Sequence, residues 1–178
     1  LLVAYLDMSP ILSTLGTMTL LNGVSILLTK GYVISGFPDV YTYLGNGLLL
    51  GIPFPIILFA LAALGLALVL GRTAFGFDLY MIGTNPVASL FSGINNRLML
   101  MKSYILSGLL SGVAGIIMSS RFNSAKSDYG SSYLLVTVLA AVLGGTSSTG
   151  GYGKVSGMVL ALVILQFVSS GLNLLQAN

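Results

Sequence analysis

The sequence predicts an all-α protein, a polytopic bundle of transmembrane helices. Only 6% of the 178 residues are charged and 56% are hydrophobic, whereas a soluble domain carries roughly a quarter charged residues. Mean hydropathy is +1.00. Several apolar runs approach the length of about 20 residues that a membrane helix needs. Because backbone groups in lipid must be hydrogen-bonded within the chain, we expect these runs to be helices.

Four apolar runs are long enough to form complete spans. They cover residues 11–29, 54–71, 103–119 and 155–175. Prolines stand at the start of the first two runs, where a missing backbone N–H costs least. A fifth apolar run, residues 132–145, is short for a span, and we expect either a short crossing helix or a re-entrant one. Residues 1–6 look like the tail of another helix, and both ends look like cuts through a longer membrane protein.

The connections carry few charges, but their distribution predicts an orientation. Residues 72–102 hold three basic residues against Asp78. Basic residues favour the cytoplasmic side of a membrane. We therefore expect this connection inside the cell, with residues 30–53 and 121–130 outside. If residues 132–145 cross the membrane, Lys154 lies inside again.

The composition argues against an enzyme. The chain has no histidine and no cysteine, and its four acidic residues are all aspartates. The commonest general bases and zinc ligands are therefore missing, and we expect no catalytic site, metal or cofactor. The net charge of +3 is small and scattered, which argues against a nucleic-acid partner. We expect membrane lipid to surround the predicted helices.

A glycine-rich stretch from Gly144 to Gly157, GGTSSTGGYGKVSG, invites a nucleotide-binding interpretation. A Walker A loop would need glycine at position 148 and a hydroxyl at position 155, around Gly153-Lys154. The chain has Ser148 and Val155 there. We therefore interpret residues 144–154, called the glycine loop below, as a turn between two membrane helices that does not bind ATP.

Polar and small residues inside the apolar runs allow two interpretations each. Asn22 and Asn173 lie within predicted helices, where a polar side chain is costly unless it faces protein or a water-filled path. They either bond neighbouring helices or contribute to a substrate path. Gly108, Gly112 and Gly115 permit close helix packing, within one bundle or between two subunits.

Four motifs in register resemble the permease subunit of ribose-type (simple sugar) ABC importers. The first is residues 72–94, RTAFGFDLYMIGTNPVASLFSGI, which is similar to the family's cytoplasmic coupling loop. The others are PILSTLG at 10–16, YLLVTVLAAVLGGTSSTGGYG at 133–153 and SGLNLL at 170–175. Together they cover nearly the whole chain. The resemblance implies that residues 1–178 are a partial transmembrane permease domain, without the first helices and the last one, and that residues 72–102 form the coupling loop.

The resemblance also implies a function and partners. The chain would be the permease subunit of an ATP-driven importer for a sugar or sugar-like solute in the bacterial cytoplasmic (inner) membrane. ATP would be hydrolysed by a separate cytoplasmic ATPase subunit. An extracytoplasmic sugar-binding protein would deliver the solute, and a second permease subunit, identical or different, would complete the path. The permease would convert ATPase movement into alternating access.

The residues that match the coupling loop are the candidates for contact with the ATPase. They are Arg72, Gly76, Tyr80, Gly83, Asn85, Ala88, Ser92, Gly93 and Ile94. Asn85-Pro86 predicts a helix start, with asparagine as the cap and proline at the first helical position. Residues 87–94 are then expected as a short helix along the membrane face.

Several positions depart from the family pattern. Phe77 stands where the family usually has arginine, and Ser89 replaces an alanine. Leu134 and Val136 stand where ribose permeases usually carry glutamate and aspartate. The lost charges favour a solute other than ribose itself.

The alternative from the residues alone is a self-sufficient secondary transporter or channel for a small polar solute. Such proteins often carry intramembrane Asp, Glu or His. All four aspartates lie in predicted connections, which favours the importer. A purely structural membrane subunit is a third interpretation.

Overall fold

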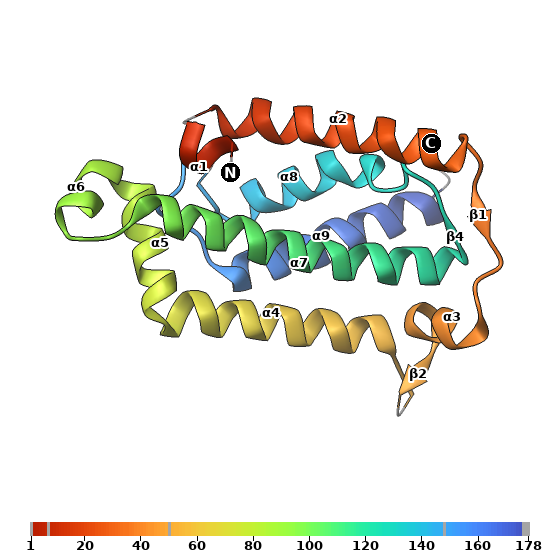
Figure 1. Ribbon diagram of the computed structural model, residues 1–178. Coiled ribbons are helices and arrows are strands. Elements are labelled where there is room, and N and C mark those ends of the chain that lie inside the picture. Colours follow the sequence, from red (N-terminus) through yellow and green to blue (C-terminus); the bar gives the residue numbers. More distant parts are fainter. Residues whose placement is uncertain (1, 7, 50, 148, 176–178) are drawn as a thin grey trace. The chain divides into compact units, whose positions relative to one another are not determined.

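The computed structural model describes residues 2–6, 8–49, 51–147 and 149–175 (Figure 1). The positions discussed above at Leu1, Ser148 and 176–178 lie outside the described residues. The chain folds as two compact units. The first contains residues 1–62 and 96–131, and the second contains residues 63–95 and 132–178.

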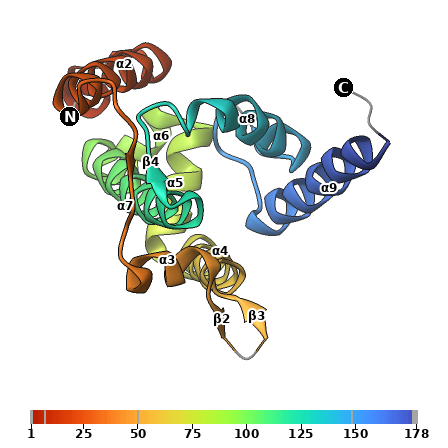
Figure 2. The ribbon, with the colours of Figure 1, turned by 90° about the vertical axis from the view of Figure 1, so that its right-hand side faces the viewer.

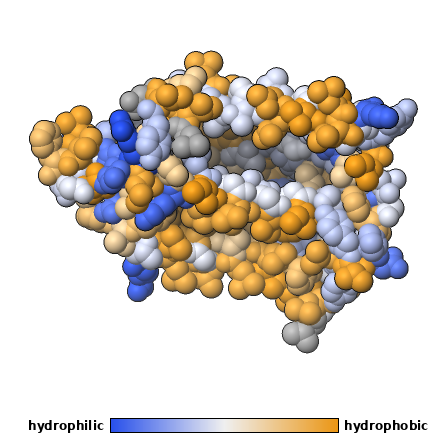
Figure 3. All heavy atoms as spheres, viewed as in Figure 1, coloured by the Kyte–Doolittle hydropathy of each residue, from blue (hydrophilic) through white to orange (hydrophobic). Residues whose placement is uncertain are grey.

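Among the described residues, four helices are long and apolar enough to cross a membrane. They are α2 (Pro10–Thr29), α4 (Phe54–Arg72), α7 (Asn96–Phe122) and α9 (Val155–Leu174). Almost none of their residues is buried, and hydrophobic surface runs over α2 and α4 on the face drawn in Figure 3. Such surface is expected for helices that face lipid or other membrane helices. All four predicted spans are confirmed as helices.

Helix α7 starts earlier than the sequence predicted. It begins at Asn96, so residues 96–102, which we had placed in the connection, form its first turns. At 1.5 Å per residue its 27 residues extend about 40 Å, beyond a hydrocarbon core of about 30 Å. The polar first turns, with Arg97 and Lys102 exposed, can therefore project from the membrane while the apolar part spans it. The connection itself ends at Asn95.

In the first unit, short elements surround the ends of the long helices. Helix α1 (Leu2–Leu6) packs on α7, and the Arg97 guanidinium carbon lies 5.7 Å from the centre of the Tyr5 ring. The long connection after α2, expected only as a loop, contains helix α3 (Asp39–Asn46). Two antiparallel strand pairs were also not anticipated. They are β1 (Ile34–Ser35) with β4 (Ser124–Ala125), and β2 (Leu48–Leu49) with β3 (Ile52–Pro53).

A buried serine joins α3 to the end of α7. The Ser120 hydroxyl donates to the carbonyl of Tyr41 (2.6 Å) and accepts from the amide of Gly45 (2.7 Å). Its side chain is fully buried. The Tyr41 hydroxyl lies 2.6 Å from that of Ser119. These bonds satisfy the buried Ser120 hydroxyl and half-buried groups around it, which makes the junction specific.

The second unit contains two helix pairs. Helices α5 (Ala74–Thr84) and α6 (Pro86–Phe91) follow α4. The 3₁₀ turn η1 (Ser131–Tyr133) leads into α8 (Leu134–Leu143), which packs side by side with α9 (Figure 2). Ala140 on α8 and Ala161 on α9 are buried, and small side chains let two membrane helices approach closely.

Candidate functional site

The site expected from the sequence is the connection between α4 and α7, residues 73–95, called the α5–α6 segment below. It begins with a sharp corner. The Thr73 hydroxyl donates to the Val69 carbonyl (2.5 Å) and accepts from the Gly76 amide (3.4 Å), which caps the start of α5. A Cβ on Gly76 would lie 2.6 Å from Leu70 Cα, so only glycine allows α5 to turn this tightly against α4. Arg72 is exposed at the end of α4, where a cation complements the helix dipole.

Helix α6 is fixed at its start by Asn85, as the sequence predicted. The Asn85 side-chain oxygen accepts from the amides of Val87 and Ala88, both at 3.0 Å, and Pro86 occupies the first helical position. Asn85 is also the C-cap of α5, and its amide donates to the Met81 carbonyl of that helix (3.0 Å). One residue therefore caps both helices, and α6 cannot turn independently of α5 without breaking these bonds.

The end of α6 is fixed as well. Gly93 has φ +83°, and the amides of Gly93 and Ile94 donate to the carbonyls of Leu90 (3.0 Å) and Ser89 (3.1 Å). This is the Schellman arrangement, which favours glycine. The helix ends at Phe91 rather than at 94 because Gly93 leaves the right-handed helical region. A six-residue helix is thus capped at both ends.

One face of α6 is apolar and exposed, which the sequence reasoning missed. Val87, Leu90 and Phe91 are 63%, 63% and 90% exposed, and Figure 3 shows hydrophobic surface at this tip. Their spacing of i, i+3, i+4 is the signal that could have found them, because it places three side chains on one helical face. Ala88 and Ser92 are exposed too. Ser89 is fully buried, with its hydroxyl on the Pro86 carbonyl (2.8 Å).

The structure brings the α5–α6 segment into contact with the glycine loop. The Tyr80 hydroxyl donates to the carbonyl of Gly153 (2.8 Å). One helical turn later, Gly83 packs directly on the backbone of Gly150 and Gly151. Tyr80 and Gly153 are 73 residues apart in the sequence. The motifs at 72–94 and 144–153 therefore form one structural site.

Helix α8 has 10 residues and therefore extends about 15 Å, half of a hydrocarbon core of about 30 Å. The two alternatives for residues 132–145, a short crossing helix and a re-entrant one, both stay predictions.

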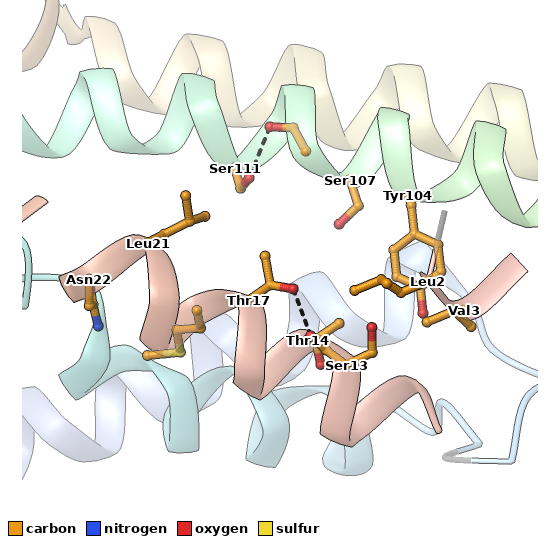
Figure 4. Close-up of a pocket in the computed structure, with 12 residues that line it drawn as sticks. Leu2, Val3, Ser13, Thr14, Thr17, Leu21, Asn22, Tyr104, Ser107 and Ser111 are labelled. Carbon is orange, nitrogen blue, oxygen red and sulfur yellow. Dashed lines mark hydrogen bonds between the residues drawn. The ribbon is translucent and has the colours of Figure 1, made fainter. Parts of the chain in front are cut away.

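The two asparagines of the expected substrate path lie in different units. Asn22 belongs to the first unit and lines a cavity of about 720 Å³ beside α2 and α7 (Figure 4). Seven polar side chains line this cavity: Ser13, Thr14, Thr17, Asn22, Tyr104, Ser107 and Ser111. Asn173 is exposed on α9 in the second unit.

Hydroxyls in this cavity donate hydrogen bonds to backbone carbonyls of their own helices. Thr17 donates to the Ser13 carbonyl (2.7 Å) and Ser111 to the Gly108 carbonyl (2.9 Å), as drawn in Figure 4. Each hydroxyl oxygen retains lone pairs that can accept a hydrogen bond. Within the described residues, no group of three or more His, Cys, Asp or Glu side chains could hold a metal ion.

Comparison with known proteins assigns the family. A family model described as branched-chain amino acid transport system / permease component matches residues 1–178. The chain belongs to this permease family. No solved structure matches the chain.

This chain is similar to curated proteins that are named as import permeases. It is 41% identical to the ribose import permease protein RbsC of Bacillus subtilis (strain 168), over 98% of this chain and 55% of the relative. It is 38% identical to the autoinducer 2 import system permease protein LsrD of Enterobacter sp. (strain 638), over 97% of this chain and 55% of that relative. The LsrD protein of Escherichia coli (strain K12 / DH10B) is 36% identical, over 97% of this chain and 54% of its own length. The chain thus spans about half the length of these relatives.

Proposed function

We propose that this chain is the greater part of a permease subunit in an ATP-driven importer, and that the α5–α6 segment is where the cytoplasmic ATPase docks. The supporting observation is the exposed apolar face of α6, formed by Val87, Leu90 and Phe91. This helix is capped at both ends by Asn85 and Gly93. A rigid helix with an apolar face suits a groove in a partner protein.

The charge pattern and the relatives support the same partner. The segment lies in the connection that basic residues assign to the cytoplasmic side. The names of the relatives describe import permeases, and the glycine loop departs from a Walker A loop at Ser148 and Val155. The ATPase activity would therefore belong to another subunit. An extracytoplasmic binding protein and a second permease subunit would complete the importer in the cytoplasmic membrane.

The proposed solute is a sugar or sugar-like molecule. Relatives are named for ribose and for autoinducer 2. The cavity beside α2 presents hydroxyls and the Asn22 amide, groups that can exchange hydrogen bonds with a polyhydroxylated solute. We propose that this cavity contributes to the path, with Asn22 as its amide contact.

The docking proposal is tested on the full-length protein, expressed together with the ATPase that is encoded by an adjacent gene. Phe91→Ala and Leu90→Ala are compared with Phe167→Ala, which removes a ring that is 74% exposed on membrane helix α9. An interface anchor costs more than about 1 kcal/mol when truncated, which is roughly a fivefold loss of affinity. We expect weaker ATPase binding for the two α6 variants and unchanged binding for the control.

Two results would contradict the proposal. Undiminished ATPase binding by both α6 variants would remove docking from this helix. Solute uptake that continues without the ATPase, driven by an ion gradient or by diffusion alone, would favour a secondary transporter or channel instead.

A further inference from the structure

The backbones of α5 and the glycine loop approach more closely than a simple turn between two helices requires. A Cβ on Gly83 would lie 2.7 Å from Gly151 Cα and 2.9 Å from the carbonyl carbon of Gly150. A Cβ on Gly151 would lie 2.8 Å from the Thr84 amide nitrogen. At Gly83, backbone therefore rests on backbone, and the side chain of Thr84 closes the contact from the other side, with its Cγ2 2.7 Å from a Cβ on Gly151.

A second contact fixes the register of the first. Tyr80 and Gly83 are three residues apart, so they lie on the same face of α5. The Tyr80 hydroxyl donates to the Gly153 carbonyl, two residues beyond the point where Gly83 meets Gly151. The glycine loop is therefore attached along one turn of α5, and sliding of one against the other would break the hydrogen bond.

The contact lies between helix α6, at one end of α5, and membrane helix α9, which follows the glycine loop. On one side, Asn85 caps both α5 and α6, so movement of α6 reaches α5 directly. On the other side, Gly153 is followed by Lys154, the N-cap of membrane helix α9. The start of α9 is also packed against the loop, because Met158 Cα would lie 2.7 Å from a Cβ on Gly144.

We propose that Tyr80 and Gly83 are positioning residues that transmit movement of α6 through the glycine loop to membrane helix α9. The inference rests on the proposed function, since the ATPase supplies the movement of α6. It assigns a mechanical role to the glycine loop, whose sequence does not match a Walker A loop. Its glycines let the backbone of the loop pack directly on the backbone of α5 at Gly83, and tightly packed elements transmit displacement instead of deforming.

The test uses the full-length importer in proteoliposomes with its ATPase and binding protein. Tyr80→Phe removes only the hydroxyl, and Gly83→Ala forces the helix and the loop apart. Tyr152→Phe removes a hydroxyl from a side chain that is 66% exposed in the same loop. Gly71→Ala adds a methyl group on α4 where nothing lies within 4 Å. These two are the matched controls.

The decisive readout is the number of ATP molecules hydrolysed per solute imported, because a merely structural role would not change it in a correctly assembled complex. One hydrogen bond corresponds to about a fivefold change in an equilibrium. We expect this ratio to rise severalfold for Tyr80→Phe and Gly83→Ala, with ATPase binding unchanged, and to stay constant for both controls.

The outcomes separate this inference from the docking proposal. If the ATPase binds and drives uptake, yet both variants keep the unmodified ratio, the transmission role is wrong and docking stands. If the unmodified protein does not bind the ATPase, docking itself is wrong. If Gly83→Ala fails to accumulate in the membrane, Tyr80→Phe alone decides the matter.

Discussion

The amide of Ile94 donates a hydrogen bond of 3.1 Å to the carbonyl of Ser89 across the end of α6. This bond forms because Gly93, between them, adopts φ +83°. The end of α6 is thereby fixed, and Ser89 is buried while Val87, Leu90 and Phe91 of the same helix are exposed. Substitutions in this helix therefore separate into those that disturb its end and those that alter only its surface.

Ala88→Trp tests the surface alone. Ala88 is exposed on α6, so we expect normal membrane insertion and normal thermal stability. In a fitted groove the added ring would cost about 1–3 kcal/mol, and about 1.4 kcal/mol lowers affinity tenfold. The measurement is ATPase affinity together with uptake. Wild-type values for both would show that α6 is not the docking helix.

Gly93→Trp is expected to weaken ATPase association or coupling as well, but for two reasons. Besides adding bulk, it places a side chain in a left-handed conformation, which costs about 1 kcal/mol or more. Gly93→Ala separates the effects, because it introduces the strain with little bulk. We expect faster amide hydrogen exchange at Ile94 in Gly93→Ala than in Ala88→Trp. Equal exchange rates in the two variants would contradict the cap.

The junction at Ser120 is expected to stabilise the first unit. Ser120→Ala leaves the Gly45 amide and the Tyr41 carbonyl without their partner, at a cost of about 1–3 kcal/mol for buried groups. Thermal unfolding of the full-length protein in detergent measures the loss. Ser103→Ala is the control, since among the described residues the Ser103 hydroxyl bonds only to a carbonyl of its own helix, that of Met99. Equal melting temperatures for the two variants would refute the role of Ser120.

The orientation can be tested with single cysteines, because the chain contains none of its own. Ser92→Cys, in the α5–α6 segment, should resist an impermeant thiol reagent added to intact cells. Ser35→Cys, exposed in the connection after α2, should react. The reason is the bias of basic residues toward the cytoplasmic side. The reverse labelling pattern would invert the topology.

The glycine loop is expected to make no contact with nucleotide. Lys154→Ala should leave the ATP affinity of the assembled complex unchanged, because the structure uses these glycines for packing against α5 and α9. Isothermal titration of the complex with a non-hydrolysable ATP analogue measures this. A clear loss of affinity in an intact complex would mean that the loop binds nucleotide after all.

The substrate path is tested by Asn22→Leu, which keeps the side-chain size and removes the amide from the cavity. We expect a severalfold rise in the KM of uptake, consistent with the loss of about 1 kcal/mol from one hydrogen bond. Asn173→Leu, on exposed surface of α9, gives the comparison for the other expected path residue. If KM rises only for Asn173→Leu, the cavity beside α2 is not the path.

Much of the architecture followed from local properties that the sequence displays directly. Composition and the length of apolar runs determined the membrane class and all four long helices, because lipid forces each span to satisfy its own backbone. Asn85-Pro86 determined the start of α6, because capping depends on neighbouring residues. The start of α7 at Asn96 was missed, since polar residues continue a helix beyond the membrane without an apolar signal.

Only the tertiary structure decided what the glycines do. Gly83 and Gly151 lie far apart in the sequence, and nothing local distinguishes a glycine in a turn from one that accepts another backbone at van der Waals distance. The partnership of Tyr80 with Gly153 and the burial of Ser120 likewise depend on which segments the fold places together. Long-range contacts of this kind have no signature in a single sequence, because the partner residues are chosen by packing and not by their neighbours along the chain.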